Sequence, residues 1–377
     1  MKKIGKEVLY LHTKTGNPRN GEGAMIRLKS GEILFAFTEY YGDSDEDHAT
    51  ARISYCISAD EGESFSEPRV LIEKGEGQLN VMSVSLVRCA DGALGILYLE
   101  KRIGAGGGQI CMPIFRRSLD EGKSFGEPID CMKEPGYYVV NNDRILCLRS
   151  GRLIFPAAFR GEYDPKESKK YASSTVFAYS DDHGLTWDKL PSELFFPYRD
   201  NTGLQEPGLY EYEDGTLWTW SRTGWGHQYQ AFSQDGGRTW SQVEPNLYFT
   251  SPDSPMQVKR LKDCSVAIFN PYGFHCLMTK FETWGVPKRT PFVCAVSRDD
   301  GKSFQPNGKS CRSGGLNDFS KRCFLLEDDE ENSYCYPAVL EVSDGFLVAY
   351  YHSENTESCL KAQKILKVHT EEIEDCL

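Results

Sequence analysis

The chain has 377 residues, of which 40% are hydrophobic and 26% charged, and its formal net charge at pH 7 is −12. This composition is typical of a soluble globular protein. The acidic balance argues against nucleic acid and against an anionic membrane surface as partners, because both require a basic surface, but a local arginine cluster could still bind a small anion.

Strand–turn–strand patterns recur along the whole chain. A lone strand candidate at 7–11 is followed by six pairs of apolar runs, most of them joined by a polar residue and a glycine, which is a strong hairpin signal. The six predicted hairpins cover 25–37, 85–99, 144–159, 209–220, 257–269 and 338–351. A last strand candidate lies at 361–368.

A second repeat, an octapeptide of the form S-x-D-x-G-x-[S/T]-[F/W], follows each of the first five hairpins. The copies begin at Ser58, Ser118, Ser180, Ser233 and Ser297, so the steps between them are 60, 62, 53 and 64 residues. The spacing indicates a repeated supersecondary unit. Within each copy the Asp can accept backbone N–H groups across a turn, the Gly permits positive φ, and the aromatic residue can pack under the strands.

Six hairpins and five octapeptides leave the sixth unit one strand short. We expect the segment 7–11 to supply that strand, because closing the ring removes the exposed sheet edges of an open structure. We find no extended helical periodicity and no linker that divides the chain. The sequence therefore predicts an all-β protein, a single six-bladed β-propeller domain over residues 1–377, in preference to a β-sandwich with additional strands.

The octapeptide resembles the Asp-box, the BNR repeat of the sialidase superfamily, and the resemblance extends over nearly the whole chain. Glu206-Pro207 and Arg222 flank the fourth hairpin and are similar to the family's E-P…R segment. In the family the Glu assists a tyrosine nucleophile, and the Arg is one of three that hold the substrate carboxylate. Arg289 resembles another of the three arginines, and Tyr336 stands where the nucleophile would be.

The resemblance also implies an acid/base aspartate in the loop before the first Asp-box. That loop contains Asp43, Asp45 and Asp47, and we choose Asp47, which is followed by His48. The chemistry is consistent with these roles. A tyrosine hydroxyl, whose reference pKa is about 10, is a poor nucleophile unless a carboxylate takes its proton. Sialidases are the tyrosine exception among glycosidases, and an arginine fork matches a carboxylate.

The resemblance fails where the family has its first arginine, in an R-I-P tripeptide. This chain has Gly21-Glu22-Gly23 there, with Arg19 two residues upstream, and so looks more like a divergent bacterial branch. Further substrate-binding candidates lie near the starts of blades. They are Arg52, expected as a charge partner of Glu22, a polar cluster of Asn142, Asp143 and Arg144, and a segment of Trp225, His227 and Gln228.

The resulting hypothesis is a retaining exo-glycosidase that removes a terminal acidic sugar, such as a sialic acid, from a small glycan. Two alternatives remain open. One is a polysaccharide or oligosaccharide lyase, which would need a base and a group that neutralises a carboxylate. The other is a non-catalytic glycan-binding propeller. Fold alone does not choose among them.

The remaining expectations concern cofactors and location. No Cys/His spacing is suited to zinc, so we expect neither a metal nor another cofactor. The N-terminal segment lacks the apolar run of a signal peptide, and no stretch approaches the roughly 20 apolar residues of a membrane span. Thirteen cysteines without a CxxC pair are consistent with free thiols. We therefore expect a cytoplasmic protein with a small acidic glycan as its partner.

Overall fold

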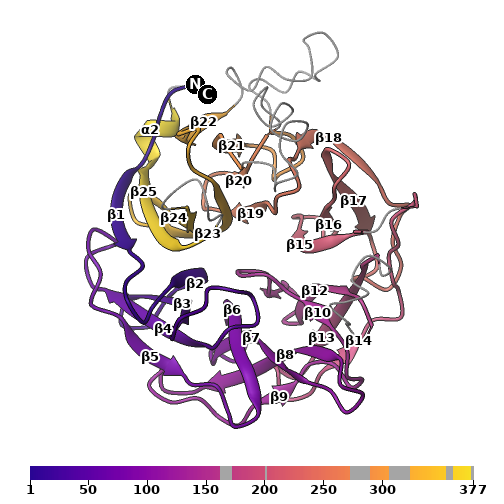
Figure 1. The fold of residues 1–377 in the computed structure, drawn as a ribbon. Coiled ribbons are helices and arrows are strands. Elements are labelled where there is room, and N and C mark those ends of the chain that lie inside the picture. The colour runs from indigo at the N-terminus through magenta and orange to yellow at the C-terminus, as the bar shows by residue number, and fades with distance from the viewer. Residues whose placement is uncertain (162–171, 200–201, 272–288, 305–322, 354–359, 375–377) are drawn as a thin grey trace.

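Six antiparallel sheets surround a central axis in the computed structural model, which describes residues 1–377 except 162–171, 200–201, 272–288, 305–322, 354–359 and 375–377 (Figure 1). Each sheet is one blade of a ring, and its first strand lies nearest the axis. The predicted six-bladed propeller is confirmed, with its six inner hairpins at the places that the repeated pattern indicated.

The first three blades contain the strands up to residue 189. Blade one consists of β2 (Arg19–Arg27), β3 (Ile33–Tyr40), β4 (Ala51–Ser58) and β5 (Arg69–Ile72). Blade two consists of β6 (Gln78–Arg88), β7 (Leu94–Ile103), β8 (Gln109–Ser118) and β9 (Ile129–Asp130). In blade three, β10 (Tyr138–Val139) and β11 (Leu146–Cys147) both pair with β12 (Leu153–Phe159), followed by β13 (Ser174–Ser180) and β14 (Asp188–Lys189).

The other three blades complete the ring. Blade four consists of β15 (Gln205–Glu211), β16 (Leu217–Arg222), β17 (His227–Ser233) and β18 (Glu244–Thr250). Blade five consists of β19 (Gln257–Arg260), β20 (Ser265–Phe269), β21 (Phe292–Ser297) and β22 (Phe324–Glu327). Blade six has β23 (Tyr334–Val342), β24 (Gly345–His352), β25 (Ala362–His369) and β1 (Lys6–Leu11), and the short helix α2 (Thr370–Glu374) follows.

The N-terminal strand closes the ring as predicted. β1 pairs antiparallel with β25, from Lys6 opposite Lys367 to Leu11 opposite Gln363. Val8, Leu9 and Leu11 pack against the apolar cluster that joins blades six and one. The outermost strand of blade six therefore comes from the opposite end of the chain, so the N-terminal strand and the C-terminal strands stabilise each other.

The Asp-boxes connect the third strand of a blade to its next segment and have one repeated geometry. In the second copy the Ser118 hydroxyl donates to Asp120 Oδ1 at 2.7 Å, and the Gly122 N–H donates to Ser118 Oγ at 2.8 Å. Asp120 also accepts the backbone N–H of Ser124 at 2.9 Å and its hydroxyl at 2.6 Å. The Ser and Asp side chains of the turn are thus satisfied within the motif, which agrees with a structural role.

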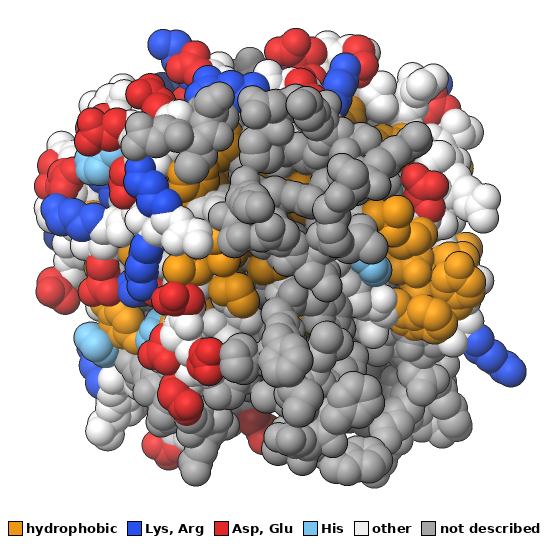
Figure 2. All heavy atoms as spheres, turned by 90° about the horizontal axis from the view of Figure 1, so that it is seen from above, with side chains coloured by type: hydrophobic (Ala, Val, Ile, Leu, Met, Phe, Trp, Pro, Cys, Tyr) orange, Lys and Arg blue, Asp and Glu red, His pale blue; other side chains and the backbone are white. Residues whose placement is uncertain are grey.

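Charged and hydrophobic side chains are distributed unevenly over the face of the ring that Figure 2 shows. Figure 2 shows acidic and basic side chains interspersed on the side of β1 and α2, and hydrophobic ones gathered on the side of β17 and β18. Exposed large hydrophobic residues between β14 and β18 are Phe195, Tyr198, Trp225 and Leu247. Among the described residues, no helix is long and apolar enough to cross a membrane.

The innermost strands share an irregularity that positions side chains at the axis. A register shift interrupts β2, β6, β15 and β23 near their starts. At each shift one residue other than glycine has a left-handed backbone, with φ between 45° and 59°: Glu22, Ser83, Glu206 and Tyr336. Each lies nine residues before the glycine of its hairpin turn, as Glu22 does before Gly31. A β-bulge of this kind redirects a side chain, and here it turns all four toward the axis.

The inner strand of blade three joins the other blades at the axis. Asn142 Nδ2 donates to the carbonyl oxygens of Gly23 at 2.7 Å and Tyr336 at 3.0 Å, in blades one and six. Asp143 Oδ1 accepts from Lys259 Nζ at 2.8 Å, in blade five. Arg144 donates to Met256 O and Gln257 Oε1, both at 2.8 Å. We call Asn142, Asp143 and Arg144 the axial clasp.

The axial clasp corrects one sequence prediction. These three residues were expected to line a substrate pocket, but their side chains are 1%, 4% and 2% exposed and are used in contacts between blades. Burial lowers the pKa of Arg144 to about 10. A buried polar group must be hydrogen-bonded to offset the loss of water, and most partners of these three side chains belong to other blades.

Replacing Arg144 should destabilise the propeller. Arg144→Leu leaves Gln257, the Met256 carbonyl and Asn141 without their donor, and we expect a loss of about 3 kcal/mol in the free energy of unfolding. The matched control is Arg52→Leu, which removes a partly exposed arginine and should cost less than about 1 kcal/mol. Urea unfolding of both variants measures the difference; equal losses would show that the clasp does not hold the blades together.

Candidate active site

A cavity of about 340 Å³ lies at the axis and is lined by residues from all six blades. The positively charged residues in its lining are Arg19, Lys101, Arg160, Arg222 and Arg289. Its carboxylic acids are Glu22, Asp47 and Glu206, and Tyr336 and His48 also contribute. Eight of the fifteen residues predicted for the site therefore meet at one place, although they come from distant parts of the sequence.

Tyr336, the predicted nucleophile, is directly hydrogen-bonded to Glu206. The Tyr336 hydroxyl donates to Glu206 Oε1 at 2.5 Å, between blades six and four. Burial, and after it the Glu206 carboxylate, raises the pKa of Tyr336 well above its usual value. The phenol is therefore protonated in the resting protein, and Glu206 is in position to take its proton.

Two arginines surround this pair. Arg222 Nη1 donates to Glu206 Oε2 at 2.6 Å, and Arg222 Nε donates to Asp253 Oδ1, also at 2.6 Å. The Arg289 guanidinium lies 5.7 Å from the centre of the Tyr336 ring and contacts Cys335 Sγ and the Asp253 carbonyl. Arg289 Nε is buried and has no hydrogen-bond partner among the described residues.

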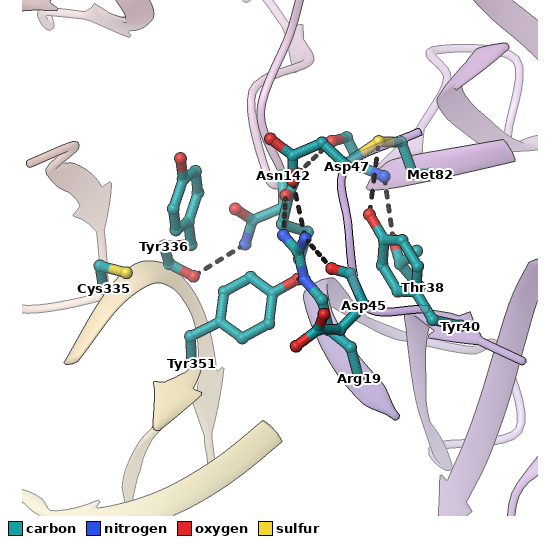
Figure 3. Close-up of polar contacts among 12 residues, drawn as sticks. Arg19, Thr38, Tyr40, Asp45, Asp47, Met82, Asn142, Cys335, Tyr336 and Tyr351 are labelled. Carbon is teal, nitrogen blue, oxygen red and sulfur yellow. Dashed lines mark hydrogen bonds and ion pairs between the residues drawn. The ribbon is translucent and has the colours of Figure 1, made fainter. Parts of the chain in front are cut away.

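Arg19 reaches the same cavity from the start of β2, as Figure 3 shows together with Asp47 and Tyr351. Its Nη1 donates to Asp47 Oδ1 at 2.7 Å, and its Nε donates to the Tyr351 hydroxyl at 2.9 Å. Burial acts to raise the pKa of Asp47, but the charges of Arg19 and Lys101 outweigh it and hold that pKa at about 2. Asp47 is therefore an ionised partner of Arg19 at neutral pH.

Glu22 lies deeper, at the bulge of β2. It accepts a short hydrogen bond from the Ser83 hydroxyl, and its Oε1 lies 3.7 Å from Arg19 Nη2. Burial raises the pKa of Glu22 to about 7, although the charge of Arg19 works in the opposite direction. The residue that replaces the family's first arginine is thus a carboxyl group that binds a proton near neutral pH.

The sequence reasoning missed several residues of the cavity. Lys101 is 5% exposed and donates to the Asp47 carbonyl at 2.8 Å, and Arg160 donates to Ser173 Oγ at 2.7 Å. Ser83 and Gln205 also belong to the lining. Lys101 could have been found from the sequence, because Glu100 and Lys101 form a charged pair at the end of an otherwise apolar strand. Arg160, Ser83 and Gln205 stand in no comparable pattern.

Besides the axial clasp, four predicted substrate-binding residues lie outside the cavity lining. Arg52 pairs with Glu39 at 2.9 Å and Glu73 at 3.2 Å, and so does not form the expected pair with Glu22. Trp225 is 49% exposed and stacks on Tyr198 with the ring centres 5.0 Å apart. His227 Nδ1 contacts the carbonyl of Asn246, and Gln228 donates to that of Ser254. The last two thus hold the backbone of blade four.

One group of side chains in the described ranges has the spacing of metal ligands: Glu63, Asp344 and His369. The Lys367 ammonium lies 2.8 Å from Glu63 and 3.1 Å from Asp344. The Lys6 ammonium lies 3.2 Å from Glu63 as well. Since two ammonium groups balance the two carboxylates, the cluster offers no net negative charge to a metal ion.

Comparison with known proteins agrees with the fold. Residues 86–349 match the BNR repeat-like domain, so the chain belongs to that family. A protein of unknown function from Dyadobacter fermentans is 18% identical, with a TM-score of 0.68, 97% of this chain covered and 99% of that one. No curated protein matches the sequence.

Solved sialidases share the same architecture. The intramolecular trans-sialidase from Ruminococcus gnavus is 14% identical with a TM-score of 0.68, and the match covers 98% of both chains. The NanB sialidase from Streptococcus pneumoniae is 13% identical with a TM-score of 0.68, and 98% of this chain and 71% of that one are covered. At such identities the likeness establishes a sialidase-like propeller fold.

Glu22 should make stability fall as the pH rises. Because the folded protein holds a proton on Glu22 up to a pH of about 7, whereas an unfolded glutamic acid loses it near 4.5, the folded state is favoured below that window and loses about 3 kcal/mol across it. Glu22→Gln removes this dependence and should be more stable than the wild type at pH 8. Thermal unfolding at pH 5 and pH 8 measures it, and a parallel decline in both proteins would contradict the assignment.

Proposed function

We propose that this protein is a retaining exo-glycosidase that removes a terminal sugar acid, with Tyr336 as nucleophile and Glu206 as the base that activates it. The observation that carries the proposal is the 2.5 Å hydrogen bond from the Tyr336 hydroxyl to Glu206, inside a cavity that also contains Arg222 and Arg289. A nucleophile, its base and two carboxylate-binding side chains are the set that such a reaction requires.

A tyrosine nucleophile suits one class of sugar in particular. When the anomeric carbon carries a carboxylate, an anionic Asp or Glu nucleophile would be repelled, whereas a neutral phenol approaches without that cost. Tyr336 is protonated at rest, so negative charge develops on its oxygen only as the proton moves to Glu206.

The cavity can hold the carboxylate beside the nucleophile. Arg289, whose Nε has no partner in the part of the chain that the structure describes, lies next to the Tyr336 ring, and Arg222 lies on the Glu206 side. The lining contains five cationic side chains against three carboxylic acids, although the whole chain has a charge of −12. A small anion is therefore favoured in the cavity, even though the protein surface is acidic.

Sialic acids and related ulosonic acids have this chemistry, and the sialidase names of two similar structures support starting with them. The test is turnover of α-glycosides of sialic acid, its deaminated analogue and common uronic acids, with product stereochemistry followed by NMR. Retained configuration in the first product supports the proposal. An unsaturated product would indicate a lyase, and binding without turnover would indicate a glycan-binding propeller.

Two substitutions separate the chemical roles from folding. Tyr336→Phe should abolish turnover while the protein still binds the sugar acid, and Glu206→Gln should lower kcat by about 10²–10⁴-fold because the phenol loses its base. Tyr334→Phe on the same strand is the control, because Tyr334 is buried outside the cavity lining. Steady-state kinetics and calorimetric binding measure these effects; full turnover in Tyr336→Phe would exclude the mechanism.

A further inference from the structure

The three carboxylic acids in the described lining of the cavity are not equivalent. Glu206 accepts both the Tyr336 hydroxyl and Arg222. Asp47 accepts Arg19 at 2.7 Å, and its side chain is 65% exposed at the mouth. Glu22 is 5% exposed and accepts a hydrogen bond from the neutral hydroxyl of Ser83. Of the three, Glu22 alone accepts its short hydrogen bond from a neutral hydroxyl that is not the nucleophile, while Arg19 Nη2 lies 3.7 Å from its Oε1.

The chain is built to place this carboxyl in the cavity. Glu22 has a φ of 50°, which costs energy for a residue with a Cβ, and its backbone is flanked by two glycines. A Cβ on Gly21 would meet the Tyr351 ring at 1.8 Å, and one on Gly23 would meet the Phe35 ring at 2.5 Å. The Gly-Glu-Gly sequence therefore lets β2 approach both rings closely while Glu22 turns toward the axis.

A single side chain couples Glu22 to the nucleophile. The amide of Asn142 donates to the carbonyl of Gly23, the residue after Glu22, and to the carbonyl of Tyr336, at 2.7 and 3.0 Å. Glu22 and Tyr336 also have the same left-handed conformation at equivalent positions of their strands. Their backbones are thus fixed relative to each other, as a nucleophile and a proton donor that act on one bond must be.

We propose that Glu22, and not Asp47, is the carboxylic acid that protonates the leaving oxygen and later activates water. This assignment rests on the glycosidase function proposed above. It also gives a catalytic role to the residue that stands where the resemblance to sialidases predicts an arginine.

The reaction balances with these groups. In the first step the Tyr336 oxygen bonds to the anomeric carbon and its proton passes to Glu206, while the glycosidic C–O bond breaks and the Glu22 proton passes to the leaving oxygen. In the second step Glu22 takes a proton from water, whose oxygen attacks the anomeric carbon. The bond to Tyr336 then breaks, and Glu206 returns the proton to the phenol.

The groups around Glu22 are consistent with a carboxyl that gains and loses a proton near neutral pH. The charged groups that influence it are Arg19 on β2, Lys101 on β7 and Asp47 in the loop before β4. The titratable neutral groups beside it are Tyr40, Cys111, Tyr336 and Tyr351, and burial raises the pKa of each. These four stay protonated at neutral pH, so they add no charge that would fix Glu22 in one state.

The experiment compares Glu22→Gln with Asp47→Asn, two carboxyl-to-amide changes in the same cavity. Each is assayed on two glycosides of one sugar acid, an alkyl glycoside and an activated nitrophenyl glycoside. An alkoxide leaving group needs a proton donor, whereas nitrophenolate does not. Glu22→Gln should therefore lower kcat on the alkyl glycoside by about 10²–10⁴-fold and on the nitrophenyl glycoside by far less.

The pH profile gives a second readout. In the wild type, kcat/KM on the alkyl glycoside should fall above a pH of about 7 as Glu22 loses its proton, and Glu22→Gln should lack this limb. Asp47→Asn should keep the limb and slow both glycosides to a similar degree. Selective loss of the alkyl substrate in Asp47→Asn, or no selectivity in Glu22→Gln, would overturn the assignment.

The outcomes also separate this assignment from the proposed function. If the wild type is active and Tyr336→Phe is inactive, but Glu22→Gln shows no preference for the activated substrate, only the role of Glu22 is wrong. If the folded wild type turns over no glycoside of the panel, the glycosidase function and the role of Glu22 both fail.

Discussion

The axial clasp is the contact on which the rest of the structure depends. Each blade pairs its strands within itself, so the blades could in principle shift against one another. Asn142, Asp143 and Arg144 oppose this together with the apolar clusters between blades, because they form buried hydrogen bonds and an ion pair with blades one, five and six. These polar groups are shielded from water, and breaking one contact leaves its partner unsatisfied at considerable cost. The relative positions of the inner strands, and hence of the active-site residues, follow from this arrangement.

The inner strands have a strained backbone conformation where they line the cavity at the axis. Glu22, Ser83, Glu206 and Tyr336 share a left-handed backbone that is unfavourable for residues with side chains, and all four line the cavity. The favourable contacts of the closed ring and of the axial clasp offset the energetic cost of this backbone conformation. The result is two hydrogen-bonded pairs across the axis, Tyr336 with Glu206 and Glu22 with Ser83, each joining two blades. The cavity therefore combines a protonated phenol, the carboxyl group that accepts its hydrogen bond, and a second carboxyl that holds a proton near neutral pH.

Sequence reasoning was most accurate where local patterns determine structure. The hairpins and Asp-boxes are short-range features, and they predicted the blades and the closing strand 7–11. The sequence also placed four residues in one site, but only through the resemblance to a family: Tyr336, Glu206, Arg222 and Arg289. It misplaced the axial clasp, because three consecutive polar residues look the same in the sequence whether they face a ligand or another blade. It also missed Lys101 and Arg160, whose approach to the cavity depends on the packing of blades two and three.

By itself, the sequence determined the number of blades, the Asp-box turns and the strand that closes the ring, since each depends on residues close together in the chain or on a repeated pattern. Only the tertiary structure decided which polar side chains face the cavity and which hold the blades together. It also decided that Arg19 pairs with Asp47 and that Glu22 is buried beside Ser83. Those outcomes depend on burial and on contacts between residues from distant blades, and neither is present in the local sequence.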